Sequence, residues 1–306
     1  MRIVLHIKKT FGEAVLKRLL ERGENIVAIC TAPDKEGKPL DPVKQLAMEK
    51  GLPVHQPASW KAPESLELMQ SFEADVCIMA YVLLLVPGPV LDAPRLGSFQ
   101  YHPSLLPMHR GPSSINWPIA MGATRTGLSI FWPNAGLDEG PILMQKECDI
   151  GPDETLGDIY FNKLFPMGVD AMIESLDLVR SGSAPKQAQN LNEGSYESWY
   201  GKAQAEIDWS KSAQDIYNTI RAANPQPGAW STVDGVTVQI YDSRKIASVD
   251  GEAGSVAEVG DQGILVSAGD EGGILISRVR PAGEGKISAT EYAASNGLET
   301  GMKLGT

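Results

Sequence analysis

The residues with the clearest capacity for chemistry lie in the stretch Ser98–Gly111, which reads SFQYHPSLLPMHRG. His102 follows the apolar run Gly97–Tyr101 and precedes a proline-rich turn. An imidazole at the end of a strand, with a stiff loop after it, can be held in one orientation, as general acid–base catalysis requires. A single histidine near a turn is also a common structural hydrogen-bonding residue, so both interpretations stay open at this point.

Two further polar residues could work with His102. Gln100 stands two positions earlier on the same expected strand, and because side chains alternate along a strand, its carboxamide points to the same side as the imidazole. Asp138 follows 36 residues after His102, in the loop Pro133–Gly140. A polarising amide, a proton carrier and a carboxylate together predict a candidate acid–base site, although an aspartate between two glycines is equally typical of a turn.

The elements that must position these residues alternate regularly. Helical patterns separate the apolar runs, which predicts βαβ units and a doubly wound, mostly parallel sheet of the α/β class. The expected strands cover residues 2–7, 25–31, 52–55, 74–81 and 97–102. Ligands of such sheets bind beyond the carboxyl ends of the strands. Three segments that follow strands could line one crevice there: Tyr81–Pro87, His102–Gly111 and Trp132–Asp138.

The pattern changes along the second half of the chain. Residues 113–121 predict a helix that Ser113 or Ser114 caps, and strands over 126–132 and 141–150 precede a long helix that Pro166 breaks. Residues 181–200 are polar and typical of a linker, and short β-rich runs with Gly-containing turns fill residues 230–280. We therefore expect a catalytic domain at 1–182, a linker at 183–203 and a small, β-rich, barrel-like domain at 204–306.

Composition disfavours several classes of function. The 306 residues carry a net charge of −11, whereas nucleic-acid-binding proteins usually have a basic footprint. The cysteines Cys30, Cys77 and Cys148 are far apart and show no metal-ligand spacing, so we expect buried thiols and no metal. No GxGxxG or Walker motif supports a nucleotide. Without a membrane-length apolar run or a signal peptide, we expect a cytoplasmic protein with no membrane partner.

Several motifs resemble the folate-dependent formyltransferases. HPSLLPMHRG at 102–111 and GLDEG at 136–140 are similar to that family's two signatures, at the family's spacing. TAPDKEGK at 31–38 and LMQKECDIGPDET at 143–155 look most like the hydrolase domain of 10-formyltetrahydrofolate dehydrogenase. IDWSKSAQDIYNTIRAANPQPGAW at 207–230 and the ending KISATEYAASNGL resemble the C-terminal domain of methionyl-tRNA formyltransferases.

The resemblance implies a Rossmann-like formyltransferase fold with an OB-like C-terminal domain, and 10-formyltetrahydrofolate as formyl donor without NAD(P). It implies that His102 is the catalytic histidine and that Asp138 positions water and assists proton transfer. Gln100 stands where the transferases have an asparagine whose amide stabilises the oxyanion. The glutamine side chain is one methylene longer than that asparagine. The positions implied to bind folate are Ala80, Tyr81, Val82, Leu83, Leu84, Pro133 and Asn134. Ser104 and Arg110 are implied to face the acceptor or an anionic group.

The formyl acceptor stays open among water, an amino sugar and methionyl-tRNA. Methionyl-tRNA formyltransferases carry a longer basic insertion in the loop that corresponds to Asp34–Pro42, where this chain has two lysines balanced by three carboxylates. This loop and the acidic composition favour water over tRNA. Because Gln100 departs from the transferase pattern, a non-catalytic folate-binding protein is an alternative of another class.

Overall fold

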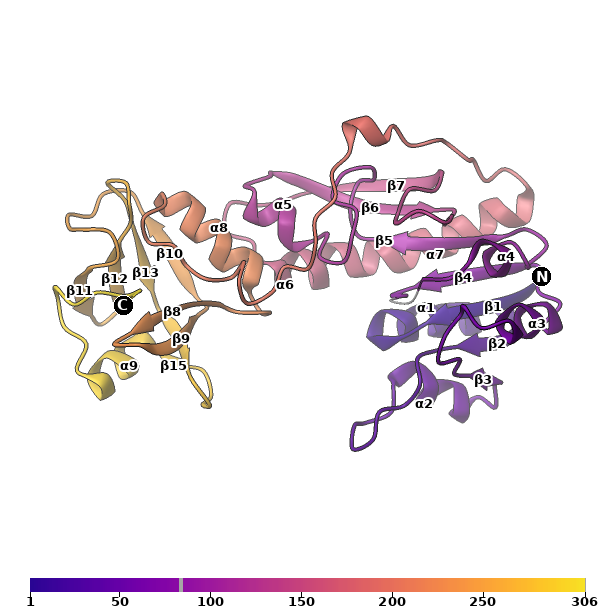
Figure 1. Cartoon of the computed structure of the whole chain (residues 1–306), viewed down its shortest axis with the longest axis horizontal. Coiled ribbons are helices and arrows are strands. Elements are labelled where there is room, and N and C mark those ends of the chain that lie inside the picture. The colour runs from indigo at the N-terminus through magenta and orange to yellow at the C-terminus, as the bar shows by residue number, and fades with distance from the viewer. Residues whose placement is uncertain (83–84, 306) are drawn as a thin grey trace. The chain divides into compact units, whose positions relative to one another are not determined.

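The computed structural model describes residues 1–82 and 85–305, which form two compact units (Figure 1). The first unit comprises Met1–Gly111, Gly127–Cys148 and Lys163–Tyr196. The second comprises Pro112–Thr126, Asp149–Asn162 and Glu197–Thr306. Each unit is therefore assembled from segments that are distant in the sequence.

The first unit is built on a seven-stranded sheet in the order β3-β2-β1-β4-β5-β6-β7. The strands from β3 to β5 run parallel, and β6 runs antiparallel to β5. The strands are β1 (Arg2–Ile7), β2 (Asn25–Cys30), β3 (Val54–His55), β4 (Val76–Ala80), β5 (Ser98–His102), β6 (Arg125–Phe131) and β7 (Ile142–Asp149). The predicted α/β class with a mostly parallel sheet is thus confirmed.

Helices cover both faces of this sheet (Figure 1). They are α1 (Lys9–Glu21), α2 (Pro42–Glu49), α3 (Glu64–Ser71), α4 (Gly88–Leu91) and α7 (Phe165–Ser181). Phe11 of α1 stacks on Tyr101 of β5 at 4.4 Å between ring centroids and contacts Phe165 of α7 edge-on. On the opposite face, alternate strand residues such as Cys77 form a core cluster with Met69 of α3.

The predicted helix break at Pro166 is confirmed. The π-helical turn η1 (Tyr160–Leu164) follows α6 (Leu156–Ile159), and α7 begins at Phe165 with Pro166 in its first turn. A proline is tolerated there because the first N–H groups of a helix have no intrahelical acceptor.

The second unit is rich in β-structure, as predicted, and holds two four-stranded antiparallel sheets in the orders β10-β13-β12-β11 and β15-β14-β9-β8. The strands are β8 (Ala229–Val233), β9 (Val236–Ile240), β10 (Ser243–Ile246), β11 (Val256–Gly260), β12 (Gly263–Ser267), β13 (Gly273–Ile276), β14 (Arg278–Pro281) and β15 (Ile287–Ser288). The helices of this unit include α5 (Asn116–Ala120), α8 (Ala213–Ala223) and α9 (Ala289–Asn296). The short 3-10 helix η2 (Leu191–Glu193) belongs to the first unit.

Two local predictions differ from the structure. Because β6 is antiparallel to β5, with Phe131 opposite Gln100, the turn after β6 does not start at the carboxyl edge of the parallel strands. The predicted cap of the helix over 113–121 is also wrong. Helix α5 begins at Asn116 without a side-chain cap, and the Ser113 hydroxyl instead accepts a hydrogen bond from the Tyr200 N–H at 2.9 Å.

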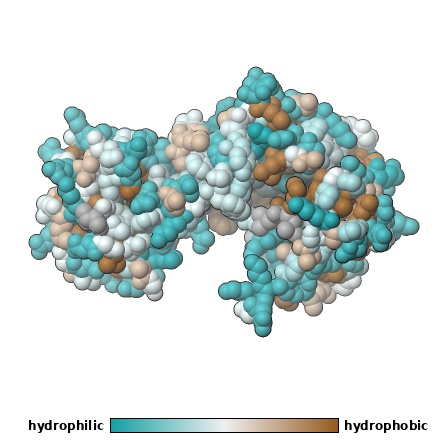
Figure 2. All heavy atoms as spheres, viewed as in Figure 1, coloured by the Kyte–Doolittle hydropathy of each residue, from teal (hydrophilic) through white to brown (hydrophobic). Residues whose placement is uncertain are grey.

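The surface carries both polar and apolar side chains. Figure 2 shows hydrophilic residues over much of the visible face of both units and clusters of hydrophobic residues on the first unit. The exposed large apolar side chains of the first unit include Met108, Leu137 and Tyr196. Across residues 1–82 and 85–305, no helix combines the length and the apolar character needed to cross a membrane.

Candidate active site

His102 and Asp138 meet in the first unit. The imidazole Nδ1 lies 3.6 Å from the Asp138 Oδ2, and the two residues are only 5% and 8% exposed. The separation is longer than a good hydrogen bond but short enough for direct electrostatic interaction. The two positions whose meeting the sequence left open therefore form a buried pair.

The second ring nitrogen of His102 faces a backbone carbonyl. Nε2 lies 3.0 Å from the carbonyl oxygen of His109. A carbonyl can only accept, so Nε2 carries the hydrogen in this arrangement and Nδ1 faces Asp138. His109 itself has a φ of 55°, an uncommon value for a residue with a side chain. The loop after β5 thus bends so that one of its carbonyl groups orients the imidazole.

The Asp138 carboxylate is held by the same loop. Its Oδ2 accepts a hydrogen bond from the Gly111 N–H at 3.0 Å, and Asp138 has a φ of 57°. The neighbouring turn requires glycine at position 140, because a Cβ there would lie 1.7 Å from the carbonyl oxygen of Trp132. Gly140 of GLDEG is therefore part of the geometry that brings the carboxylate to the imidazole.

Ser129 and Gln145 anchor the start of the loop after β5. The Ser129 hydroxyl donates to the Ser104 carbonyl at 2.7 Å and accepts from the Leu106 N–H at 3.0 Å. The Gln145 amide donates to the Leu106 carbonyl at 2.9 Å. Ser104 is fully buried, and its own hydroxyl donates to the Met108 carbonyl. In the structure the Ser104 hydroxyl is therefore engaged within the loop, and its predicted role toward an acceptor stays a prediction.

Gln100 and His102 share one face of β5. Tyr101 stands between them and stacks on Phe11, so the Gln100 and His102 side chains project toward the opposite face. Arg110 pairs with Glu139, the residue after Asp138, at 2.8 Å. The structure thus brings Gln100, His102, Asp138 and Arg110 into one region, while their chemical roles stay predictions.

The residues predicted to bind folate follow β4 and β6. Ala80 is buried at the end of β4, Tyr81 is 45% exposed with a φ of 61°, and Val82 packs against the core cluster near α3 and α4. Leu83 and Leu84 lie outside the described residues. Pro133 and Asn134 begin the turn after β6, where the Asn134 side chain accepts from the Gly136 N–H at 2.9 Å.

Two residues that contact this region were not predicted. The Gln189 amide donates to the carbonyls of Asp138 and Gly140, and the Ser195 hydroxyl accepts from the His109 N–H. Both lie in the polar segment that the sequence describes as a linker. Its composition carries no signal for contacts with the loops that hold His102 and Asp138.

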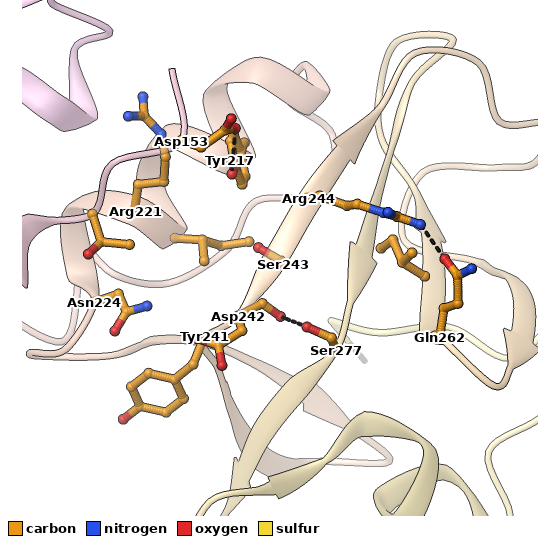
Figure 3. Close-up of a pocket in the computed structure, with 13 residues that line it drawn as sticks. Asp153, Tyr217, Arg221, Asn224, Tyr241, Asp242, Ser243, Arg244, Gln262 and Ser277 are labelled. Atoms are coloured by element: carbon orange, nitrogen blue, oxygen red, sulfur yellow. Dashed lines mark hydrogen bonds between the residues drawn. The ribbon is translucent and has the colours of Figure 1, made fainter. Parts of the chain in front are cut away.

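A separate hollow of about 580 Å³ lies in the second unit (Figure 3). Within it the Tyr217 hydroxyl donates to Asp153 at 3.0 Å, and burial together with that carboxylate raises the pKa of Tyr217 to about 12. The Arg221 guanidinium donates to the carbonyls of Gly151 and Glu154. The Arg221 Nε and the Ser243 hydroxyl are buried without a hydrogen-bond partner among the described residues. None of the predicted site residues lines the hollow. In the described part of the chain, no group of three or more His, Cys, Asp or Glu side chains is placed to hold a metal.

Comparisons with known proteins agree along both units. Residues 1–176 match the formyl transferase family, and residues 201–297 match the formyl transferase C-terminal domain. The mitochondrial 10-formyltetrahydrofolate dehydrogenase of Mus musculus is 36% identical over 305 residues, which cover 95% of this chain and 33% of that protein. This chain therefore spans about a third of the length of that dehydrogenase.

A second relative matches over its whole length. The methionyl-tRNA formyltransferase of Geobacter sulfurreducens is 33% identical over 310 residues, which cover all of this chain and 97% of that protein. Among solved structures, HypX from Aquifex aeolicus in complex with tetrahydrofolic acid superposes with a TM-score of 0.66 at 17% identity, over 96% of this chain and 47% of that one. The sugar 3N-formyl transferase WlaRD gives a TM-score of 0.69 at 17% identity, over 90% and 97%.

Proposed function

This chain belongs to the formyl transferase family, and on that premise we propose that it takes the formyl group of 10-formyltetrahydrofolate and passes it to water through His102, Asp138 and Gln100. Folate-dependent formyl transfer is the activity that family membership supports. The observation that carries the assignment of residues is the buried contact between His102 and Asp138, at 3.6 Å.

The proposed reaction is an acyl transfer from N10 of the folate. Water adds to the formyl carbon and loses a proton, which gives a tetrahedral intermediate with a negatively charged oxygen. When this intermediate collapses, the bond from carbon to N10 breaks, and N10 takes up a proton, so that formate and tetrahydrofolate leave. His102 and Asp138 would carry these protons, because a positioned imidazole beside a carboxylate can accept and return a proton.

Gln100 would act on the charge rather than on the proton. It shares a face of β5 with His102, so its amide can donate a hydrogen bond to an oxygen that develops charge beside the imidazole. A single donor of this kind typically contributes a factor of about 10²–10³ in kcat. The positioned acid–base group typically contributes about 10²–10⁴.

Water is the favoured acceptor because of the charge of the chain. Its net charge is −11, and Lys44 pairs with Asp34 at the base of the short loop that follows β2. A tRNA acceptor is a polyanion whose binding depends on unpaired basic side chains. The resemblance of the segments 31–38 and 143–155 to the hydrolase domain of 10-formyltetrahydrofolate dehydrogenase also favours a hydrolytic use of the formyl donor.

A second candidate is formyl transfer to methionyl-tRNA. The similarity to a methionyl-tRNA formyltransferase spans 97% of that protein, whereas the similarity to the dehydrogenase spans 33% of that one. A relative of matching length that shares both units supports a shared acceptor. Amino sugars and other small amines form a third class of acceptor.

The test is an absorbance assay for tetrahydrofolate formation from 10-formyltetrahydrofolate. We expect turnover with water alone and no more than about a twofold increase when methionyl-tRNA or an amino sugar is added. Turnover that requires methionyl-tRNA or an amine would replace water as the acceptor. Folate binding without turnover under any of these conditions would contradict the enzymatic proposal and favour a binding protein.

A further inference from the structure

We propose that Gln189 and Ser195, in a strap formed by residues 185–196, are positioning residues that hold Asp138 and His102 in their reactive geometry. Each acts through the backbone of a loop that carries or contacts a reacting group. The inference deepens the proposed function and rests on it for its kinetic consequences.

The strap is firmly attached to the sheet unit at its beginning. Ile142 of β7 and Gln187 exchange two backbone hydrogen bonds, at 2.7 Å and 3.0 Å. The Trp132 indole donates to the Pro185 carbonyl at 2.9 Å, and the Lys186 ammonium lies over the Trp132 ring at 4.7 Å from its centroid. The segment is therefore an additional, irregular edge of the first unit.

Gln189 braces the turn that carries Asp138. Its side-chain nitrogen donates to the Asp138 carbonyl at 3.0 Å and to the Gly140 carbonyl at 2.6 Å. One amide thus fixes both ends of a turn in which Asp138 has a φ of 57°. The Gln189 Oε1 is buried and has no hydrogen-bond partner among the described residues, which costs free energy. The two donated bonds are therefore the contacts that give this side chain its orientation.

Ser195 holds the peptide that orients His102. Its hydroxyl accepts from the His109 N–H at 2.9 Å, and its carbonyl accepts from the Arg110 N–H at 3.1 Å. The Arg110 N–H and the His109 carbonyl belong to one peptide plane and point in opposite directions. Ser195 therefore holds one side of that plane, while the carbonyl on the other side faces the His102 Nε2 at 3.0 Å.

The strap contacts both loops of the proposed site. The Ser195 N–H donates to the Pro107 carbonyl, and a Cβ on Gly194 would lie 2.5 Å from that same oxygen. The strap thus packs directly on the loop after β5 and, through Gln189, on the turn after β6. Because misplacing a reacting group by about 1 Å can cost about 10²-fold in rate, loss of either brace should lower kcat.

The kinetic test compares Gln189→Ala with Gln187→Ala. Gln187 is also a glutamine, two positions earlier in the strap. Its backbone forms the two hydrogen bonds with Ile142, which Gln187→Ala would keep. We expect Q189A to lower kcat at least about tenfold, with KM for 10-formyltetrahydrofolate within about twofold and the thermal midpoint within a few degrees of wild type. Q187A should retain wild-type kcat. A kcat for Q189A within twofold of that for Q187A would overturn the role of Gln189.

Gln189→Glu gives a second readout that a merely structural role would not move. An ionised glutamate would place carboxylate oxygens against two carbonyl oxygens, whereas a protonated one can donate one hydrogen bond. The ratio of Q189E to wild-type activity should therefore rise as the pH falls. A ratio that does not change with pH would contradict the proposed donation.

The spectroscopic test does not require turnover. The chain has four histidines, so ¹⁵N-histidine labelling yields a simple spectrum. Ser195→Ala should change the ring-nitrogen shifts of His102, whereas Ser183→Ala, which removes an exposed hydroxyl bonded to Ser181, should leave them unchanged. S195A removes the hydroxyl that accepts from the His109 N–H and keeps the carbonyl that accepts from the Arg110 N–H. Unchanged His102 shifts in S195A would overturn the role of the Ser195 hydroxyl. If wild type shows no turnover with any acceptor, the proposed function fails, and these spectra alone decide whether the strap orients His102.

Discussion

Two buried histidines on the same sheet, His6 on β1 and His102 on β5, have opposite surroundings. They are 8% and 5% exposed. The His6 Nε2 accepts a hydrogen bond from the Trp60 indole at 3.2 Å, and burial, with a smaller contribution from Lys8, lowers the pKa of His6 to about 3. His102 instead has an oxygen acceptor near each ring nitrogen, the His109 carbonyl and the Asp138 carboxylate.

The difference shows that burial alone does not identify a histidine that can carry protons. A donor aimed at Nε2 requires a lone pair there, so His6 stays neutral and serves as a hydrogen-bonded core residue. Each ring nitrogen of His102 instead faces an oxygen atom that can accept a hydrogen bond. The chemistry of the neighbouring atoms therefore separates a structural imidazole from a candidate catalytic one.

The largest effect should come from removing either member of the His102–Asp138 pair. His102→Ala and Asp138→Ala should each lower kcat by about 10²–10⁴ and leave the protein folded, because a positioned acid–base group contributes that much. Steady-state turnover of 10-formyltetrahydrofolate, with circular dichroism as the folding control, measures this. Near-full activity in either purified variant would show that the His102–Asp138 pair is not catalytic, so that His102 would be a structural residue like His6.

Gln100 should give the next largest effect. Gln100→Ala removes the proposed oxyanion donor, and we expect kcat to fall by about 10²-fold with KM for the folate within about threefold. Gln100→Asn restores a carboxamide that is one methylene shorter and should recover part of the loss. Equal activities for wild type and Q100A would show that the site stabilises the oxyanion without this side chain.

His6 should affect stability with a defined pH dependence. Its pKa of about 3 in the folded protein lies below the unfolded value of about 6.5, so the unfolded chain binds more protons between these values. The contribution of His6 is fully present above about pH 6.5 and is lost as the pH falls, by about 2 kcal/mol at about pH 5. His6→Gln keeps an acceptor for Trp60 without this titration.

Denaturant unfolding of wild type and H6Q across pH measures that contribution. The difference between their free energies of unfolding should be constant above about pH 7 and should change steadily below it, while kcat stays within about twofold of wild type. If the free energies of unfolding of wild type and H6Q ran parallel across pH, the predicted titration of His6 would be wrong. A loss of turnover in H6Q comparable to that in H102A would contradict a purely structural role for His6.

Lys8 should have the smallest effect. Its charge is the lesser cause that lowers the pKa of His6, so Lys8→Gln should raise that pKa. Because the interaction is small, we expect a gain of roughly 0.5 kcal/mol or less in stability near pH 4, measured by the same unfolding series. Lys9→Gln removes the adjacent lysine as a matched control. A larger gain in stability in K9Q than in K8Q would show that Lys9, not Lys8, is the lysine that acts on His6.

Much of the sheet could be predicted from the sequence, which also offered His102 and Asp138 as candidate site residues. The apolar runs around Val4, Ile29 and Ile78 predict strands because both faces of a parallel sheet are buried. The proline after Phe165 predicts the helix break because proline lacks the N–H that continues a helix. His102 and Asp138 were predicted from residue type and motif spacing.

The parts that could not be predicted depend on long-range contacts. The antiparallel direction of β6 is not encoded in its own apolar pattern, which is the same for either direction. The sequence predicts that the Ser113 hydroxyl caps a helix, but in the structure it accepts a hydrogen bond from the Tyr200 N–H, 87 residues away. Gln189 and Ser195 stand in a polar segment whose composition is typical of a linker, and nothing local indicates which carbonyl or N–H they meet.

The sequence by itself determined the sheet class, because apolar periodicity is a local property, and the likeness of its motifs indicated the family and the candidate site residues. Only the tertiary structure decided that Nδ1 of His102 faces Asp138, that Nε2 faces a carbonyl, and that His6 faces an indole N–H. Two of those neighbours, Asp138 and Trp60, lie 36 and 54 residues away from their histidines along the chain. Since the neighbouring atom sets what an imidazole can do, the chemistry of each histidine is a property of the folded chain.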